Sequence, residues 1–325
     1  MKRNSILSIF ISLITVLTSC RNNSENWLFK EAGTLLWVDN SMLDTVIKKA
    51  VKETLENSSV IIAQSSWSPS DTSFVNNIKW YHLLAKQGGK AFMLNIDWLE
   101  NNRSNTRGGW SFENKEIKNK FIKDIKQLVQ LYNPNYLTLG VEVNYYALTN
   151  PVGYKEFISV FNELKKELKK DNSDMKIGLS FQLELLYGIH TDWKQNKSLE
   201  SLNAIVENLD YIGISTYPDV LVPKMNNYIY SINYLDTLSN NYKKPIGITE
   251  TGISSLKYSD IERSKYIKAI YEMGEKIDLK FLIWGSIIDN SMQGNWKDNL
   301  GLIYSDGKVK PEFEQWKNLN FKILK

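Results

Sequence analysis

Two glutamates stand where they could do chemistry together. The apolar run 136–141 is followed directly by Glu142, and the run 245–249 is followed directly by Glu250. Two carboxyl groups that face each other across a cavity can supply a proton donor and a nucleophile. Hydrolysis of a glycosidic bond uses such a pair, held about 5–5.5 Å apart in enzymes that retain the anomeric configuration. For either glutamate taken alone, a solvated residue at a strand end explains the position equally well.

The composition excludes several other chemistries. Among 325 residues there are only two histidines, His82 and His190, and one cysteine, Cys20. A three-histidine zinc site, a disulfide framework and a CxxC redox pair therefore cannot be built. With 40 basic against 36 acidic residues, the net charge of +4 is too weak to indicate nucleic acid as a partner. We expect no metal and no organic cofactor.

The elements that must position the two glutamates read as repeated strand-then-helix units. Short apolar runs alternate with longer amphipathic stretches, the pattern of a parallel sheet built from βαβ units. The predicted strands are 34–38, 60–64, 91–96, 136–141, 176–181, 211–216, 245–249 and 281–285, and predicted helices include 43–55, 114–131, 154–168 and 260–277. Eight units predict a single α/β domain, a (β/α)8 TIM barrel, in which strands 4 and 7 lie on opposite sides of the mouth. No Gly-rich phosphate loop follows the first strand, which argues against a dinucleotide site.

The N-terminus is predicted to be a targeting segment. Lys2 and Arg3 precede the apolar run 6–17, which is too short to span a bilayer and is typical of a secretory signal. The run ends in Leu-Thr-Ser-Cys20, which resembles the bacterial lipoprotein box and implies lipidation of Cys20. We therefore predict a signal peptide over 1–19, an anchor and tether over 20–32, and the barrel over 33–325. The expected location is the cell envelope, outside the cytoplasm and attached to a membrane.

Several motifs resemble clan A glycoside hydrolases, the retaining (β/α)8 group. Glu142 and Glu250 look like its acid/base and nucleophile, and the segment 209–218 is similar to the strand 6 motif of arabinogalactan endo-β-1,4-galactanases. The resemblance implies that Tyr217 hydrogen-bonds the nucleophile and that Trp284 forms the floor of a sugar subsite. Residues 301–316 look like the closing loop and last helix of the same group. The resemblance covers residues 33–318 and implies a polysaccharide or oligosaccharide substrate.

One position departs from the clan pattern. Clan A enzymes usually carry Asn immediately before the acid/base, to hold the substrate 2-hydroxyl, whereas this chain has Val141. Asn144, Asn95 and Asp97 are candidates for a substitute. We also expect burial and the second carboxylate to raise the pKa of Glu142, and the Tyr217 hydroxyl to favour ionised Glu250.

Other polar and aromatic residues follow the predicted strands. Trp37, Trp67 and Trp98 are as consistent with packing beneath loops as with stacking on sugars. Gln64, Gln182, Asn95 and Asp97 end their strands and are candidates for hydrogen bonds to hydroxyls. His190 is either a subsite residue or an exposed loop histidine. The segment 101–109, with Arg103 and Arg107, is predicted to be a substrate loop, with a disordered segment as the alternative.

Two functions from different classes remain open on the sequence alone. The leading interpretation is a membrane-anchored retaining glycoside hydrolase acting on β-linked glycans. The alternative is a catalytically impaired barrel that binds glycans at the cell surface. The glutamate pair favours the enzyme, and Val141 favours the binding protein.

Overall fold

The computed structural model describes residues 31–37, 42–71, 74–193, 197–221, 229–277, 279–290 and 295–324. The predicted signal peptide and Cys20 lie outside the described residues, so both stay predictions. Within the described part, none of the helices has both the length and the apolar character needed to cross a bilayer. The first strand starts at Glu31, so the barrel already includes two residues that the sequence assigns to the tether.

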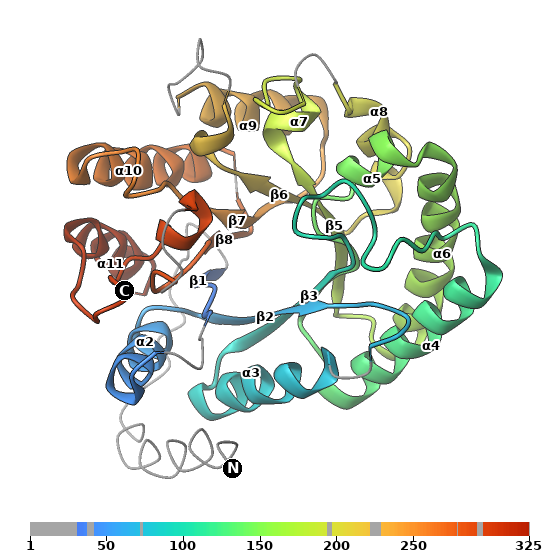
Figure 1. Cartoon of the computed structure of the whole chain (residues 1–325), viewed down its shortest axis with the longest axis horizontal. Helices are drawn as coiled ribbons and strands as arrows, with labels where there is room; N and C mark the ends of the chain where they lie inside the picture. The colour runs from blue at the N-terminus through green and yellow to red at the C-terminus, as the bar shows by residue number, and fades with distance from the viewer. Residues whose placement is uncertain are drawn as a thin grey trace.

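Eight parallel strands form a ring with helices packed around its outside, as Figure 1 shows. The strands are β1 (Glu31–Thr34), β2 (Val60–Ser66), β3 (Ala91–Asp97), β4 (Tyr136–Thr138), β5 (Lys176–Gln182), β6 (Tyr211–Thr216), β7 (Ile246–Thr251) and β8 (Phe281–Trp284). Strand pairing runs from β2 through β8 to β1. Between β1 and β2 the Ser59 backbone N–H donates to the Ala32 carbonyl oxygen at 2.8 Å. The predicted single TIM barrel is confirmed.

The helices alternate with these strands. They are α2 (Asp44–Glu56), α3 (Phe74–Gly88), α4 (Lys115–Tyr132), α5 (Asn144–Thr149), α6 (Pro151–Asp171), α7 (Leu183–Leu186), α8 (Leu199–Asn203), α9 (Ile229–Asn241), α10 (Asp260–Lys276) and α11 (Pro311–Leu324). Local sequence explains where several begin. The Asn114 side chain accepts from two backbone N–H groups of the first turn of α4, and Ser259 with Glu262 forms a capping box at α10.

Seven of the eight predicted strands differ from the structure in their bounds, and only 211–216 matches; three of the differences bear on the site. The first strand was predicted at 34–38, but β1 ends at Thr34, where pairing with β8 stops. The fourth was predicted to reach Val141, but β4 ends at Thr138, and residues 139–143 continue beside β5 through irregular hydrogen bonds. The seventh is longer than predicted, so Glu250 lies inside β7 instead of after it.

The barrel interior is filled by alternate residues of the strands. Phe281 and Ile283 of β8 point inward with Tyr211 and Met93, and the Tyr211 and Phe281 rings meet edge to face at 5.1 Å between centroids. A Cβ atom at Gly247 would lie 2.2 Å from the Phe281 ring, which explains the glycine there. The interior is therefore packed below the mouth, and open space remains at the carboxyl ends of the strands.

Candidate active site

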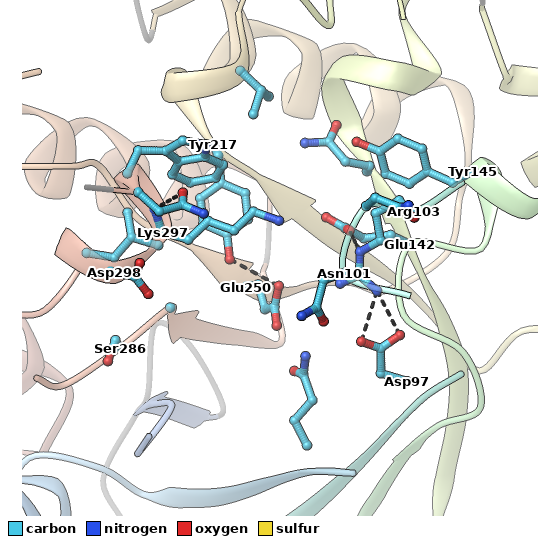
Figure 2. Close-up of a pocket in the computed structure, with 18 of the residues that line it drawn as sticks. Asp97, Asn101, Arg103, Glu142, Tyr145, Tyr217, Glu250, Ser286, Lys297 and Asp298 are labelled. Carbon is cyan, nitrogen blue, oxygen red and sulfur yellow. Dashed lines mark hydrogen bonds and ion pairs between the residues drawn. The ribbon is translucent and has the colours of Figure 1, made fainter. Parts of the chain in front are cut away.

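A cavity of about 550 Å³ opens at the carboxyl ends of the strands. The predicted site residues on its wall are Glu142, Glu250, Tyr217, Asp97, Gln182 and Trp37. Glu142 and Glu250 are almost fully buried, at 5% and 6% exposure. The two carboxyl groups come from opposite sides of the ring, and Figure 2 shows them facing the same space.

Glu250 is held by Tyr217. The Tyr217 hydroxyl donates to Oε2 of Glu250 at 3.0 Å, drawn as a dashed line in Figure 2. Tyr217 directly follows β6 and Glu250 lies on β7, so two neighbouring strands fix this pair. The hydrogen bond that the sequence resemblance implies is present.

Glu142 reaches the cavity through an unusual backbone conformation. Its φ angle is +53°, in the left-handed region that non-glycine residues seldom adopt. Strain of this kind persists where the surroundings enforce it, and it concentrates at functional sites. The Ser215 hydroxyl of β6 donates to Glu142 Oε1 at 2.6 Å. Oε2 lies 2.7 Å from Nε of Arg103.

Arg103 links Glu142 to a second carboxylate. Its Nη1 atom lies 2.7 and 2.9 Å from the two oxygens of Asp97, at the end of β3. Arg107 approaches the same carboxylate, with Nη2 3.4 Å from Oδ2. Both arginines belong to the segment 101–109, and with Asn101 they line the cavity. The prediction of a substrate loop there agrees with this placement.

Burial does act to raise the pKa of Glu142 and the Tyr217 hydroxyl does act to lower that of Glu250, as expected, but other groups reverse both net shifts. Burial alone would raise the pKa of Glu142, but Arg103, Lys297 and the Ser215 hydroxyl outweigh it, so the pKa is lowered. Burial and the charge of Glu142 raise the pKa of Glu250 to about 7, against the opposing effects of Arg103 and Tyr217. Of the two carboxyl groups, Glu250 is therefore the one that holds a proton more readily. The sequence could not show this difference in pKa, because Arg103 lies on a loop whose position is defined only in the folded chain.

Three predicted substrate-binding residues do not line the cavity. Trp284 is 1% exposed, donates from Nε1 to the Leu300 carbonyl oxygen and packs on Trp316. Side chains alternate along a strand, and inward-facing Phe281 and Ile283 direct Trp284 outward. The subsite floor predicted at Trp284 is therefore wrong.

Asn95 and Asn144 are engaged elsewhere. Asn95 is fully buried in the barrel, where its Oδ1 accepts from the Thr138 hydroxyl at 2.7 Å. Asn144 is fully buried and donates from Nδ2 to the Gln182 carbonyl oxygen and to Ser198 Oγ, both at 3.0 Å. Neither amide can replace the asparagine that Val141 displaces. Asp97 does line the cavity, but it accepts hydrogen bonds and is paired with Arg103.

The other tryptophans divide between packing and the cavity. Trp67 and Trp98 are buried, with their N–H groups donating to Asp124 and to the Leu139 carbonyl oxygen, so they pack beneath loops. Trp37 is 43% exposed at the cavity edge. Trp296 also lines the cavity and meets the Tyr217 ring at 5.1 Å between centroids. With the partly exposed Trp193 on the same wall, these rings offer surfaces on which a sugar could stack.

His190 is buried on the cavity wall at 4% exposure, so the exposed-loop alternative is wrong. Its Nδ1 accepts from the Asp192 backbone N–H, which leaves the proton on Nε2, 3.0 Å from the Tyr145 hydroxyl. Burial lowers the pKa of His190.

Tyr145 and Ser215 were not predicted as site residues from the sequence, although Ser215 lies inside the strand 6 motif that carries the resemblance.

No group of three or more His, Cys, Asp or Glu side chains among the described residues is arranged to hold a metal ion. The groups at this site are carboxylates, a tyrosine hydroxyl and cations. They suit proton transfer and nucleophilic attack.

No family model matches the sequence, and no curated protein matches it. The fold is similar to solved structures of glycosidases. An exo-β-1,4-mannosidase from Opitutaceae bacterium strain TAV5 has a TM-score of 0.70 at 12% identity, covering 94% of this chain and 63% of that one. A fungal β-1,4-galactanase has a TM-score of 0.60 at 14% identity, covering 82% and 90%.

Bacteroides uniformis β-glucuronidase 2 also has a TM-score of 0.60 at 14% identity. The match covers 89% of this chain but only 35% of the glucuronidase, so this chain spans about a third of that protein. At such low identities the likeness establishes the fold. The chain therefore has a (β/α)8 barrel similar to that of these solved structures.

Proposed function

We propose that this chain is a retaining glycoside hydrolase that cleaves β-linked glycans, with Glu250 as nucleophile and Glu142 as acid/base. The observation that carries the proposal is the Tyr217–Glu250 hydrogen bond opposite a second buried carboxyl group in one cavity. Barrel enzymes place their chemistry at this end of the strands. The solved glycosidases of the same fold support the reaction class.

The first step would join Glu250 to the sugar. A Glu250 oxygen attacks the anomeric carbon while the bond to the leaving oxygen breaks, and Glu142 gives that oxygen a proton. In the second step Glu142 takes a proton from water, whose oxygen displaces Glu250 from the anomeric carbon. Tyr217 keeps the Glu250 oxygen oriented for attack. The two steps restore both carboxyl groups.

A two-substrate comparison tests the assignment. Glu142→Gln is expected to lower hydrolysis of alkyl and glycan substrates by about 10²–10⁴-fold, because their leaving groups need a proton. The same variant keeps much of its activity on aryl glycosides with acidic phenols, which leave unaided. Glu250→Gln loses both activities. Glu156→Gln, on α6 and outside the cavity wall, is the control. Undiminished turnover in Glu250→Gln would refute the assignment.

A second function, glycan binding without turnover, is favoured by the ion pair between Arg103 and Glu142. An acid/base that stays ionised cannot protonate a leaving group. A panel of β-glycans separates the two functions: binding with no turnover on any glycan, by both the wild type and Glu250→Gln, establishes the binding protein.

We further propose that the barrel is carried on a lipid-modified Cys20 in the cell envelope. The support is the sequence alone, an apolar run followed by the only cysteine of the chain. Cys20→Ala is expected to move the protein from the membrane fraction to the soluble fraction and to abolish incorporation of radiolabelled fatty acid. Unchanged labelling in that variant would contradict lipidation at Cys20.

A further inference from the structure

We infer that the cavity accepts glycans bearing an anionic group, a carboxylate or a sulfate, and that Arg103 is the residue that recognises this group. The inference rests on the proposed function, since it names the substrate class of the same site.

Arg103 is a loop residue directed into the cavity. Its φ angle of +61° is left-handed, and its side chain is only 12% exposed. Figure 2 shows the guanidinium beside both Asp97 and Glu142. Nη1 and Nε take part in these two ion pairs, and Nη2 takes part in neither. Because a guanidinium carries five N–H donors, further donors remain for a ligand.

Two buried guanidinium N–H groups lack a hydrogen bond. Nε of Arg103 lies 2.7 Å from Glu142 Oε2, yet its N–H is not aligned with any acceptor among the described residues. Nε of Arg107 is likewise buried without an acceptor. Both Nε atoms are shielded from the cavity, so a ligand there would use the other N–H groups of the two arginines, which line the same wall. The planar fork of a guanidinium suits the oxygen atoms of a carboxylate or sulfate.

A third cation lies on another part of the wall. Lys297 belongs to the short helix Trp296–Asn299 that follows β8, and it lines the same cavity. It forms no ion pair within the described part of the chain, and its ammonium lies 5.6 Å from the centre of the Trp296 ring. Its charge lowers the pKa of Glu142. The cavity therefore offers positive charge from two loops.

Positive charge on the wall is concentrated at the loop 101–109. Arg103 and Arg107 lie there side by side against the single carboxylate of Asp97, and Arg103 also pairs with Glu142. Apart from the two glutamates, the other charged groups of the wall, Lys297, Asp192 and Asp298, are exposed or half-buried, so solvent screens them. An anionic group beside Arg103 and Arg107 would meet the least screened cations of the cavity.

An anionic ligand would also favour the proton on Glu142, where the first step of the reaction needs it. Glu142 must be protonated to act as an acid, and Arg103 opposes its protonation. A neutral sugar leaves that ion pair in place. A carboxylate or sulfate that takes over the guanidinium would free Glu142 and raise its pKa, so that it can take a proton. A charged substrate would thus be turned over faster than a neutral one.

The test compares ligands that differ only in charge. Oligomers of β-1,4-linked glucuronic acid, their carboxyl-reduced neutral form and sulfated cello-oligosaccharides are titrated calorimetrically into the full mature chain carrying Glu250→Gln, which prevents turnover. We expect one or both anionic ligands to bind about 10- to 100-fold more tightly than the neutral one, the range for a hydrogen bond to a charged group. The carboxylate and sulfate arms identify the anion.

Variants assign the preference to Arg103. In the Glu250→Gln background, Arg103→Gln is expected to abolish the preference and Arg103→Lys to retain part of it. Lys118→Gln, which removes a cation paired with Glu156 on the outer helices, should leave it unchanged. Circular dichroism melting verifies that each variant folds. Equal binding of neutral and anionic ligands, failure of every anionic ligand to bind, or an unchanged preference in Arg103→Gln overturns the inference.

The outcome is separable from that of the proposed function. Hydrolysis of neutral glycans without any charge preference would overturn the inference and leave the glycoside hydrolase in place. Arg103-dependent binding of anionic glycans, with no hydrolysis by the wild type, would refute the hydrolase and keep the recognition of anions.

Discussion

Nε of Arg103 lies 2.7 Å from Oε2 of Glu142, so the carboxyl group assigned to proton donation is paired with a cation. The same guanidinium contacts Asp97, which fixes its position from the other side. The two carboxyl groups therefore differ in pKa, and the arginine of the loop 101–109 decides which of them has the lower value. Glu142 is stabilised as an anion, and Glu250 holds a proton more readily.

Replacing Arg103 is expected to change the pH dependence of catalysis. Without the guanidinium, the pKa of Glu142 rises, because burial and Glu250 then act unopposed by that cation. Glu142 has the lower pKa of the two carboxyl groups, so its titration sets the acidic limb of kcat/KM, and this limb moves upward in Arg103→Gln. The measurement is a pH profile with an alkyl β-glycoside, whose leaving group needs the proton of Glu142. A limb at the same pH as in the wild type would mean that Arg103 does not control Glu142.

Removing the Tyr217 hydroxyl is expected to act on the nucleophile. The hydroxyl lowers the pKa of Glu250, so Tyr217→Phe raises that pKa further. Glu250 has the higher pKa of the two carboxyl groups, so the alkaline limb of kcat/KM moves upward. Loss of a hydrogen bond to a charged group lowers kcat/KM at the optimum by about 10- to 100-fold. Tyr154→Phe, whose hydroxyl donates to the Ser201 carbonyl oxygen away from the cavity, is the control. An unshifted alkaline limb would contradict the role.

Glu184 is expected to make stability depend on pH. It is fully buried, and burial raises its pKa to about 7, although Oε1 accepts from the Thr216 and Ser231 hydroxyls. The folded state then binds the proton more tightly than the unfolded chain. The resulting stability is present in full below pH about 4.5, is lost as the pH rises to about 7 and changes little above that.

The shift from 4.5 to about 7 corresponds to roughly 3 kcal/mol for Glu184. Glu184→Gln keeps an acceptor oxygen and removes this titration. Denaturant unfolding between pH 4.5 and 8 should therefore show a shallower decline for the variant than for the wild type. Glu250 contributes in the same window, so the wild-type slope should exceed that of either single variant. Parallel curves for Glu184→Gln and wild type would refute the assignment.

How far the sequence predicts this molecule depends on the range of the interactions involved. The barrel, Glu142, Glu250 and Tyr217 follow from strand patterns and motifs, which are local. The prediction for Trp284 is wrong because side chains alternate between the two faces of a strand. A difference of one position therefore decides whether a side chain faces the barrel interior or the helix layer. Asn95 and Asn144 end or follow strands as expected, but partners distant in sequence bury them.

The ionisation of Glu142 and Glu250 could not be predicted from the sequence, because it depends on a contact between residues that are distant in the chain. Arg103 reaches Glu142 from 39 positions away, through a loop whose shape depends on Asp97. Residue types alone indicated burial and a second carboxylate, both of which raise a pKa. The sign of the shift at Glu142 depends on which carboxyl group the loop arginine contacts, and only the folded chain defines that contact.

The loop that carries Trp296 and Lys297 is expected to depend on a buried ion pair. Lys310 is fully buried, with Nζ 2.8 Å from Asp289 Oδ1, and the same oxygen accepts from the Gly301 backbone N–H. Asp289→Ala leaves a buried ammonium without its counter-ion, which costs about 3–5 kcal/mol. Urea unfolding should show this loss, together with weaker glycan binding, because residues 289 and 301 bracket the loop. In Asp289→Ala/Lys310→Met, which removes both charges, most of the stability should return. If the double variant is as unstable as Asp289→Ala, the loss arises from the Gly301 contact and not from the stranded charge.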